Sequence, residues 1–505
     1  MAALQKLFIQ AERHAGAALA PLLHRRHART LARGAIDERA AAAARDSWWG
    51  SDLRWYPGGT PPRAHNRVTP LIDGEEYFSA LHEALTQATA YVYITGWCLT
   101  PYVPLLRQAP GDLVRTRLVD VLAGVAQRLP VRVLLWGGAP ALIHPTRRTM
   151  NAVAATLNRP PGDLVCCLDT TAVRTHCHHQ KSIIIDGQVA FVGGMDLTTF
   201  AGDRWDGRGH ALRAGINWHD AELRIEGEAV ADVEHNFRQR WEAVTGDHAL
   251  PTRAATVDPS WQTRVQVTRT IPPNRYAFAP KGEFGIHHAY IEAIRAARKF
   301  IYIETQYLWS PEIMDALSEA IRGRDRASFR VVIVLPARAT SGKWDNDQHV
   351  ERLRSVDAGG GVFEAYSIFS SGPTTGESAF HYRPIYVHAK VAIIDDEWLT
   401  VGSANLNNRG MVTDSELNIT ISDPATARAL RISLWSEHLG VPPKDVEDAN
   451  PTALIDSVWK QKASANARVS RRGARPLESS VHRYEAGLSP GALILDELEA
   501  ATFEH

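Results

Sequence analysis

The chain has 505 residues, of which 45% are hydrophobic and 22% are charged, as in ordinary globular proteins and unlike disordered or fibrous ones. Its 56 Lys and Arg residues equal its 56 Asp and Glu residues, which disfavours a protein whose main task is to hold nucleic acid. This length suffices for two or more domains with full hydrophobic cores.

Neither disulfides nor a membrane span are expected. No run of about 18 apolar residues occurs, and the alanine-rich stretch 15–23 holds Pro21 and is followed by basic residues, unlike a signal peptide. We therefore expect a cytoplasmic or peripheral membrane protein, with export without a cleavable signal peptide as the alternative. The four cysteines are too few for a disulfide framework and lack the spacing of zinc ligands: Cys98, Cys166, Cys167 and Cys177.

The first 62 residues are predicted to form a helical extension and a linker. Apolar residues recur at steps of three and four between Leu4 and Leu23, and basic residues follow them. A basic amphipathic helix can lie on an anionic lipid surface. Packing against the body of the protein is favoured, because surface helices are amphipathic anyway. The turn-rich segment 57–62 marks the boundary.

Strands and helices then alternate, which predicts an α/β layered fold. Helices are expected over 75–90, 113–128 and 229–244, and strands over 91–94 and 131–136. The polar segment 245–262 holds two prolines and is predicted to connect two halves.

The same elements recur in the second half of the chain. Strands are expected over 265–269, 300–307 and 329–335, with a helix over 286–299 between the first two. The segment Asp414-Ser-Glu416-Leu417 is interpreted as the repeat of Asp220-Ala-Glu222-Leu223. Residues from about 463 to 480 are polar and arginine-rich and are expected to be a solvated tail. The predicted divisions are therefore 1–62, 63–262, 263–445 and 446–505.

A short motif, H-x-K-x-x-x-x-D, occurs once in each half, and its histidines lie 388 − 179 = 209 positions apart. Seven positions after each motif aspartate comes Gly193-Gly194 or Gly402-Ser403. A single H-x-K would be unremarkable, but two copies inside a longer repeat indicate function. The motif residues are His179, Lys181 and Asp186 in the first copy and His388, Lys390 and Asp395 in the second.

The motif predicts a hairpin that presents cations on one side. On a strand, His179 and Lys181 would point the same way, and Asp186-Gly187 would form a tight turn. The returning strand would bring the glycine pair beside the histidine, where backbone N–H groups could approach an anion closely.

Two such hairpins facing each other would place two imidazoles and two ammonium groups around one phosphate. One neutral imidazole would attack phosphorus and form a phosphohistidine, while the other gives a proton to the leaving oxygen and later takes one from water or an alcohol. An acid should orient each ring, and the candidates are Glu416 and either Asp220 or Glu222. This chemistry needs no metal and no cofactor.

These residues resemble the phospholipase D superfamily, whose motif usually occurs twice per active unit, over about residues 66–440. Segments flanking the motifs, among them His178-His179-Gln-Lys181, Trp218-His219-Asp220 and Tyr302-Ile-Glu304-Thr-Gln306, are similar to the eukaryotic-type branch. The resemblance implies an α/β fold of two tandem, similar α/β/α sandwich halves. They would pack with pseudo-two-fold symmetry around one shared active site.

The resemblance also implies roles for single residues. His179 would be the nucleophile and His388 the general acid and base, while Asp186 and Asp395 would support the motif. Asp196 takes the place of Asn405 in the first copy, so the phosphate contacts need not be symmetric. Phosphate would contact Lys181, Lys390 and Asn405. The other residues expected on the substrate side are Gly194, Ser403, Asp196, Gln306 and Arg204. Trp97 and Trp205 are further candidates, although packing in the core would explain them equally well.

The expected activity is that of a phospholipase D acting on phosphatidylcholine or phosphatidylethanolamine, with transphosphatidylation as a side reaction. A cardiolipin synthase-type phosphatidyltransferase is the main alternative, although such enzymes usually carry N-terminal membrane spans. A nucleic-acid phosphodiesterase is disfavoured by the neutral charge and the lipid-type flanks, and a non-catalytic lipid-binding module by the two intact motifs. The expected partner is phospholipid at a membrane surface, with no nucleic acid, and the chain is expected to act as a monomer. No calcium-binding or regulatory lipid-binding domain fits the remaining length, so calcium control is not expected.

Overall fold

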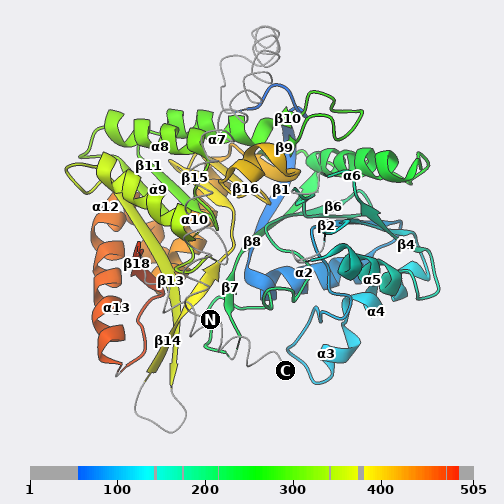
Figure 1. Cartoon of the computed structure of the whole chain (residues 1–505), viewed down its shortest axis with the longest axis horizontal. Helices are drawn as coiled ribbons and strands as arrows, with labels where there is room; N and C mark the ends of the chain where they lie inside the picture. The colour runs from blue at the N-terminus through cyan, green and yellow to red at the C-terminus, as the bar shows by residue number, and fades with distance from the viewer. Residues whose placement is uncertain are drawn as a thin grey trace.

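The computed structural model describes residues 55–140, 145–172, 176–213, 215–339, 343–373, 380–473 and 475–487. The expected helix within residues 1–45 lies outside the described residues. The described chain forms two successive α/β units in which strands pair in the same order (Figure 1). No helix among the described residues is both long and apolar enough to span a bilayer.

The first unit contains a sheet with the strand order β4-β3-β2-β5-β6-β8-β1. Strands β2, β3 and β4 run parallel, and the remaining pairs are antiparallel. The strands are β1 (Arg63–Ile72), β2 (Val92–Gly96), β3 (Val131–Trp136), β4 (Leu164–Asp169), β5 (Ser182–Ile185), β6 (Val189–Gly193) and β8 (Ala221–Gly227). The helices are α2 (Asp73–Gln87), α3 (Asp112–Arg115), α4 (Leu118–Ala126), α5 (Arg147–Leu157) and α6 (Ala229–Thr245).

The second unit repeats this order as β13-β12-β11-β15-β16-β17-β9, and β9 pairs with β1. Strand β14 (Phe380–Val387) pairs in parallel with β7 (Asn217–His219) and links the units again. The other strands are β9 (Thr263–Ile271), β10 (Glu283–Phe284), β11 (Phe300–Glu304), β12 (Arg330–Val334), β13 (Phe363–Pro373), β15 (Val391–Ile394), β16 (Trp398–Gly402) and β17 (Glu416–Ile421). The helices are α7 (Gly285–Ala296), α8 (Pro311–Gly323), α9 (Lys343–Val356), the π-helix η1 (Arg409–Thr413) and α10 (Pro424–Leu439).

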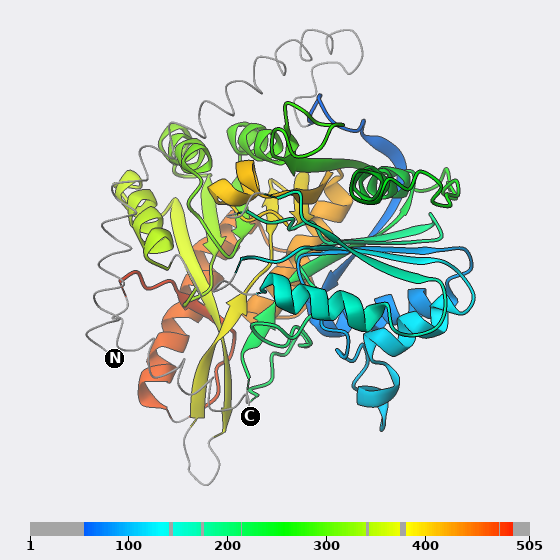
Figure 2. The same ribbon diagram turned by 45° about the vertical axis from the view of Figure 1, so that its right-hand side comes forward.

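Both sheets are buried on both faces, which is why their central strands are almost wholly apolar. Along β12, Val331 and Ile333 face an outer core of the second unit, while Val332 and Val334 face a core shared by both units. Helices α2, α4 and α5 cover the outer face of the first sheet, and α7, α8 and α9 cover that of the second. These outer layers lie on opposite sides of the molecule, and α6 and α10 pack into the shared core (Figure 1, Figure 2). The predicted pair of α/β/α halves is confirmed.

The expectation of a solvated tail near residues 463–480 is wrong. Strand β18 extends the second sheet by pairing with β13, and Trp459 is fully buried in the shared core. Helix α13 buries Ala463, Asn466 and Val469 and exposes its arginines, so its average composition looked polar although one face is packed. The elements here are α11 (Pro443–Glu447), α12 (Pro451–Leu454), η2 (Ile455–Trp459), α13 (Lys460–Arg472) and β18 (Val481–Arg483).

The proposed divisions of the chain stay predictions. Strand β1 begins at Arg63 and β9 at Thr263, so the matching first strands of the two units start one residue after the proposed boundaries at 62 and 262.

Candidate active site

The two motif segments lie at the boundary between the units, and each is held by the other unit. His179 and Lys181 precede β5, and His388 and Lys390 precede β15, so the expected strands begin later than predicted. The backbone N–H of His179 donates to the carbonyl of Ser415 at 2.8 Å, and that of His388 to the carbonyl of His219 at 2.8 Å. This exchange brings both motif copies to one place.

Each motif imidazole contacts an acid from the opposite unit. The Nδ1 atom of His179 lies 3.0 Å from Glu416 Oε2, and that of His388 lies 2.6 Å from Asp220 Oδ2. A hydrogen bond at Nδ1 fixes the tautomer and leaves Nε2 as the reactive nitrogen. The two side chains remain 14% and 10% exposed, which keeps them reachable.

The lysines differ in their counter-charges. Lys181 Nζ lies 3.0 Å from Asp196 Oδ2 and donates to the carbonyl of His179 at 3.0 Å. Lys390 donates to the carbonyl of His388. Burial lowers the pKa of Lys390 to about 7, and the neighbouring Lys181 ammonium adds to this effect. A bound anionic phosphate would favour the ammonium form of Lys390.

The protonation states of the imidazoles and acids follow from burial and from these lysines. Burial and Lys181 lower the pKa of His179, and burial and Lys390 lower that of His388, so both rings are neutral in the phosphate-free site. Burial raises the pKa of Glu416 well above its usual range, and Lys181 only partly opposes this. Burial also disfavours the Asp220 carboxylate, but His388 and Lys390 outweigh it and lower the pKa of Asp220. Burial thus favours the neutral form of the acid behind His179, whereas the acid behind His388 is favoured as a carboxylate.

Strand register corrects the expected equivalence of the acidic strands. Gly193 pairs with Glu222 across β6 and β8, whereas Gly402 pairs with Asn418 across β16 and β17. Glu222 therefore corresponds to Asn418, and Asp220 corresponds to Glu416. Because Glu222 accepts a hydrogen bond from the Met195 backbone at 3.3 Å and contacts neither imidazole, Asp220 is the orienting acid of the first unit.

The glycine pair has a different role from the one predicted. The N–H of Gly194 donates to the carbonyl of Ala221, and that of Ser403 to the carbonyl of Leu417, so neither is free to bind an anion. A Cβ on Gly194 would lie 2.1 Å from Asp220 Oδ1, and Ser403 Oγ donates to Glu416 Oε2 at 2.5 Å. Gly194 and Ser403 therefore pack against the two acids, and a substrate contact by either residue stays a prediction.

The motif aspartates lie at the ends of their strands that are far from the imidazoles. Asp186 and Asp395 adopt a φ of 58° and close the hairpin turns. Their carboxylates accept backbone N–H groups at the starts of β2 and β11, from Tyr91 and Phe300 among others. Seven residues of extended chain at about 3.3 Å each separate Asp186 from His179, a span of roughly 20 Å. Both aspartates support the hairpins structurally.

The remaining predicted residues surround the imidazoles on two sides. The Arg204 guanidinium lies 3.8 Å from the ring centroid of Trp218, whose own centroid lies 5.1 Å from that of His388. Trp218 stacks on Tyr386, and Gln306 Nε2 donates to the Tyr386 hydroxyl at 2.7 Å.

On the other side, the rings of Trp97 and His179 meet edge to face, with 6.2 Å between centroids. Trp97 and Trp205 both pack against the core of the first unit. Asn405 Oδ1 is buried without a hydrogen-bond partner among the described residues. This acceptor could be satisfied by a donor group of a substrate, such as a hydroxyl or an ammonium group.

A buried network beside His179 was missed from the sequence. His178 Nε2 lies 2.9 Å from Asp169 Oδ1, and His178 Nδ1 lies 2.8 Å from Ser415 Oγ. Arg240 donates to the other oxygen of Asp169 at 2.8 Å. The network ties the first motif to the residue that precedes Glu416. The doubled histidine at 178 and 179 was its only local signal.

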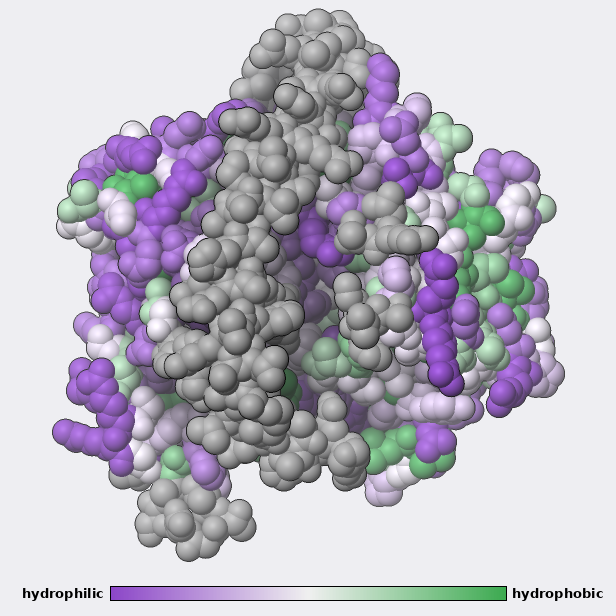
Figure 3. Space-filling model, viewed as in Figure 1, coloured by the Kyte–Doolittle hydropathy of each residue, from purple (hydrophilic) through white to green (hydrophobic). Residues whose placement is uncertain are grey.

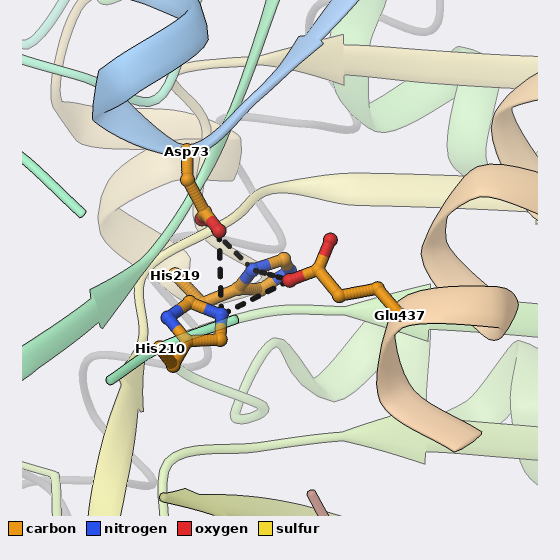
Figure 4. Close-up of side chains that lie close together, drawn as sticks. All are labelled: Asp73, His210, His219 and Glu437. Atoms are coloured by element: carbon orange, nitrogen blue, oxygen red, sulfur yellow. Dashed lines mark hydrogen bonds and ion pairs between the residues drawn. The ribbon is translucent and has the colours of Figure 1, made fainter. Parts of the chain in front are cut away.

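A second buried cluster lies directly behind Asp220 and contains Asp73, His210, His219 and Glu437 (Figure 4). His219 Nδ1 lies 3.0 Å from Asp73 Oδ1 and 3.6 Å from Glu437 Oε1, and His210 Nε2 lies 3.0 Å from the same glutamate oxygen. Asp73 Oδ1 also accepts the N–H of Asp220 at 3.0 Å, so the cluster braces the orienting acid.

The cluster can exist as an ion-pair network or as the ligand set of a divalent cation. Two imidazoles and two carboxylates are a donor set that zinc accepts. The outer nitrogens of His219 and His210 lie 2.9 Å from Glu304 and 3.4 Å from Asp206, as is usual for metal-bound histidines. Without an ion, burial opposes the protonation of His210, but Asp73 and its other acidic neighbours raise its pKa to about 10. Neither the ion-pair form nor the cation-bound form of this cluster tests the prediction that the reaction needs no metal at the phosphate.

The ion-pair state predicts that stability declines at alkaline pH. Since the folded pKa of His210 exceeds its ordinary value of 6.5, its stabilisation is complete below pH 6.5 and is lost as the pH rises to and through 10. We expect the urea midpoint to fall over this range, and to fall less in His210→Gln. Stability that instead resists alkaline pH but drops on addition of EDTA would indicate a bound cation.

Comparisons with known proteins agree with this architecture. A sequence profile described as "Cardiolipin synthase, PLD-like domain" matches residues 290–436. Phospholipase D A of Dictyostelium discoideum is 28% identical over 475 residues, which cover 76% of this chain and 36% of that protein. Phospholipase D alpha 4 of Arabidopsis thaliana is 26% identical over 526 residues, which cover 77% and 68%. The chain thus spans about a third of the first relative and two thirds of the second.

A solved structure supports the fold independently. The crystal structure of phosphatidylserine synthase from Haemophilus influenzae Rd KW20 superposes with a TM-score of 0.50 and 12% identity, covering 82% of this chain and 97% of the other.

Proposed function

Because the chain belongs to the phospholipase D superfamily, we propose that it is a phospholipase D. It hydrolyses the distal phosphodiester bond of phosphatidylcholine or phosphatidylethanolamine to phosphatidic acid and the free head group. The observation that carries the proposal is the pair of imidazoles, His179 and His388, each anchored through Nδ1 by an acid of the opposite unit. Two buried lysines beside them offset the charge of a phosphodiester.

In the first step, His179 Nε2 attacks phosphorus and the bond to the head-group oxygen breaks. His388, protonated at Nε2, gives its proton to that leaving oxygen. Burial and Lys181 keep His179 neutral and therefore nucleophilic. Burial and Lys390 lower the pKa of His388, and the Asp220 carboxylate opposes this lowering. A bound anionic phosphate opposes it as well and so favours the imidazolium form.

In the second step, water attacks the phosphohistidine and gives a proton to His388 Nε2. The P–N bond breaks, phosphatidic acid leaves, and both histidines regain their starting states. An alcohol in place of water gives a phosphatidyl alcohol by the same path. Lys181, Lys390 and the side-chain NH₂ group of Asn405 are the proposed donors to phosphate. Arg204 and Gln306 are proposed to lie on the substrate side behind Trp218 and Tyr386.

One chain supplies both halves of this site, so we propose that it acts as a monomer, without nucleic acid, at a membrane surface. A phosphatidyltransferase of the cardiolipin synthase type is the second candidate, because the profile that matches residues 290–436 carries that description. The two candidates share the covalent intermediate and differ in the acceptor.

Product analysis separates these activities. We expect phosphatidic acid from mixed phospholipid vesicles, and phosphatidylethanol when ethanol is added, measured by mass spectrometry. A chain with His179→Asn and His388→Asn, prepared identically, is the control. Cardiolipin as the dominant product from phosphatidylglycerol would favour the transferase, and an unchanged lipid spectrum would refute both.

A further inference from the structure

The segment between β2 and α4 carries an unusual group of exposed apolar side chains. Among the described residues, the large apolar side chains with the highest exposure are Leu113 at 58%, Val114 at 57% and Tyr102 at 56%. All three lie in this one segment. Figure 3 shows apolar surface around α3 at the lower edge of the molecule. The single helix expected over 113–128 is broken here, so that α3 projects from the body (Figure 1).

The segment that exposes these apolar side chains is itself held in place by buried residues and backbone hydrogen bonds. Leu99, Val103 and Leu105 of the same segment are buried in the core of the first unit. The N–H of Leu105 donates to the carbonyl of Thr116 at 2.9 Å, and the N–H of Leu118 donates to the carbonyl of Val103 at 2.9 Å. The segment therefore sorts its apolar residues into an inner set and an outer set.

The same segment is joined to the wall of the active site. It follows Trp97, whose ring meets that of His179. The N–H of Thr100 donates to the carbonyl of Leu197 at 2.9 Å, and Arg107 forms a two-bonded ion pair with Asp203. Residues 196–206 also include Asp196 and Arg204, which lie near the motif residues. The exposed apolar side chains are therefore held in a fixed position relative to the active site.

The exposed charged residues around Tyr102, Leu113 and Val114, within the segment between β2 and α4, are positive. The sole acid of this segment, Asp112, is buried, and its carboxylate accepts the N–H of Ala109 at 2.7 Å. Arg115 is exposed, and the Arg117 guanidinium lies 5.9 Å from the ring centroid of Tyr102. An aromatic ring, two aliphatic side chains and neighbouring arginines suit the boundary between phospholipid head groups and acyl chains.

We propose that this tip, formed by Tyr102, Leu113, Val114, Arg115 and Arg117, docks the protein on a phospholipid bilayer. This inference rests on the proposed function, which requires access to lipid in a membrane. Leu113 and Val114 enter the interface, the arginines are attracted to the net negative charge of anionic lipids, and the fixed loop holds the active site at the level of the head groups.

The test compares the full chain carrying Leu113→Ser and Val114→Ser with the wild type and a control. The control is Val257→Ser, at an apolar residue that is 42% exposed in the connection between the units. Sedimentation with phosphatidylcholine vesicles containing phosphatidylglycerol should show binding at least about tenfold weaker for the double variant, since two aliphatic side chains no longer leave water. The control should bind as the wild type does.

Activity on two substrates keeps this proposal separate from the proposed function. The double variant should lose activity on vesicles in proportion to binding, yet keep that on a short-chain monomeric phosphatidylcholine. Unchanged vesicle binding of the double variant, or none by the wild type, would overturn the docking proposal even if the monomeric lipid is hydrolysed. Weaker binding of the double variant, with a wild type inactive on both substrates, would support docking and refute the proposed function.

Substitution of Arg115 and Arg117 provides a second, independent test. Arg115→Gln with Arg117→Gln should weaken binding to anionic vesicles and leave binding to pure phosphatidylcholine nearly unchanged, with a smaller dependence on salt than the wild type. A loss that is equal on both vesicle types would contradict the assigned attraction of these arginines to anionic lipid.

Discussion

Replacing either motif histidine by asparagine is expected to lower kcat by at least about a thousandfold, because each removes a group that the reaction needs in every turnover. His179→Asn removes the nitrogen that attacks phosphorus, and His388→Asn removes the proton donor. The measurement is the initial rate on short-chain phosphatidylcholine, which does not depend on docking to vesicles. His248→Asn, at a side chain that is 70% exposed, is the matched control.

The two variants should also differ from each other. With a substrate whose leaving group is p-nitrophenolate, which needs no proton, His388→Asn should still release one equivalent in a burst and retain phosphate on His179. His179→Asn should give no burst. Mapping of the phosphate to His388 would reverse the assigned roles, and near-normal turnover by either variant would refute the two-histidine mechanism.

The meeting of His179 and His388 could be expected from the sequence because the motif recurs with its surrounding elements. Two similar units in one chain pack about an approximate two-fold axis, and such an axis places equivalent residues together. The apolar residues that follow each motif lysine form the buried strands β5 and β15.

The choice between Asp220 and Glu222 could not be made in the same way. The two residues lie two positions apart, so in an extended strand they point to the same face. Only the pairing of Gly193 with Glu222 and of Gly402 with Asn418 shows which acid reaches an imidazole. A shift of two residues leaves every polarity pattern unchanged, and sequence pattern alone therefore cannot detect it.

The buried cluster was invisible for a different reason. Asp73, His210, His219 and Glu437 come from four separate places in the chain, and no spacing among them matches a local ligand motif. Asp73 stands at the start of α2 with a φ of 62°, and Glu437 lies in α10 of the other unit. Only the folded arrangement brings these residues behind Asp220.

Asp220→Asn should reduce kcat far more than Glu416→Gln, although the two acids are structural equivalents. Burial raises the pKa of Glu416 well above its usual range, which favours its neutral form, and glutamine keeps a carbonyl oxygen that can accept from His179 Nδ1. Asp220 is charged, and its carboxylate stabilises the imidazolium form of His388 at 2.6 Å.

We expect a loss of about 10²–10⁴ for Asp220→Asn, as for acids that orient a catalytic histidine, and a loss of less than about tenfold for Glu416→Gln. The pH profile of kcat supplies a second readout. Without the Asp220 carboxylate, the alkaline limb set by His388 should move to lower pH, because the imidazolium loses its counter-charge. Glu416→Gln should leave that limb in place. Two outcomes would contradict this prediction: equal losses of kcat in the two variants, or an unchanged alkaline limb in Asp220→Asn. Either would mean that the charges of the two acids do not determine which imidazole is the nucleophile and which is the proton donor.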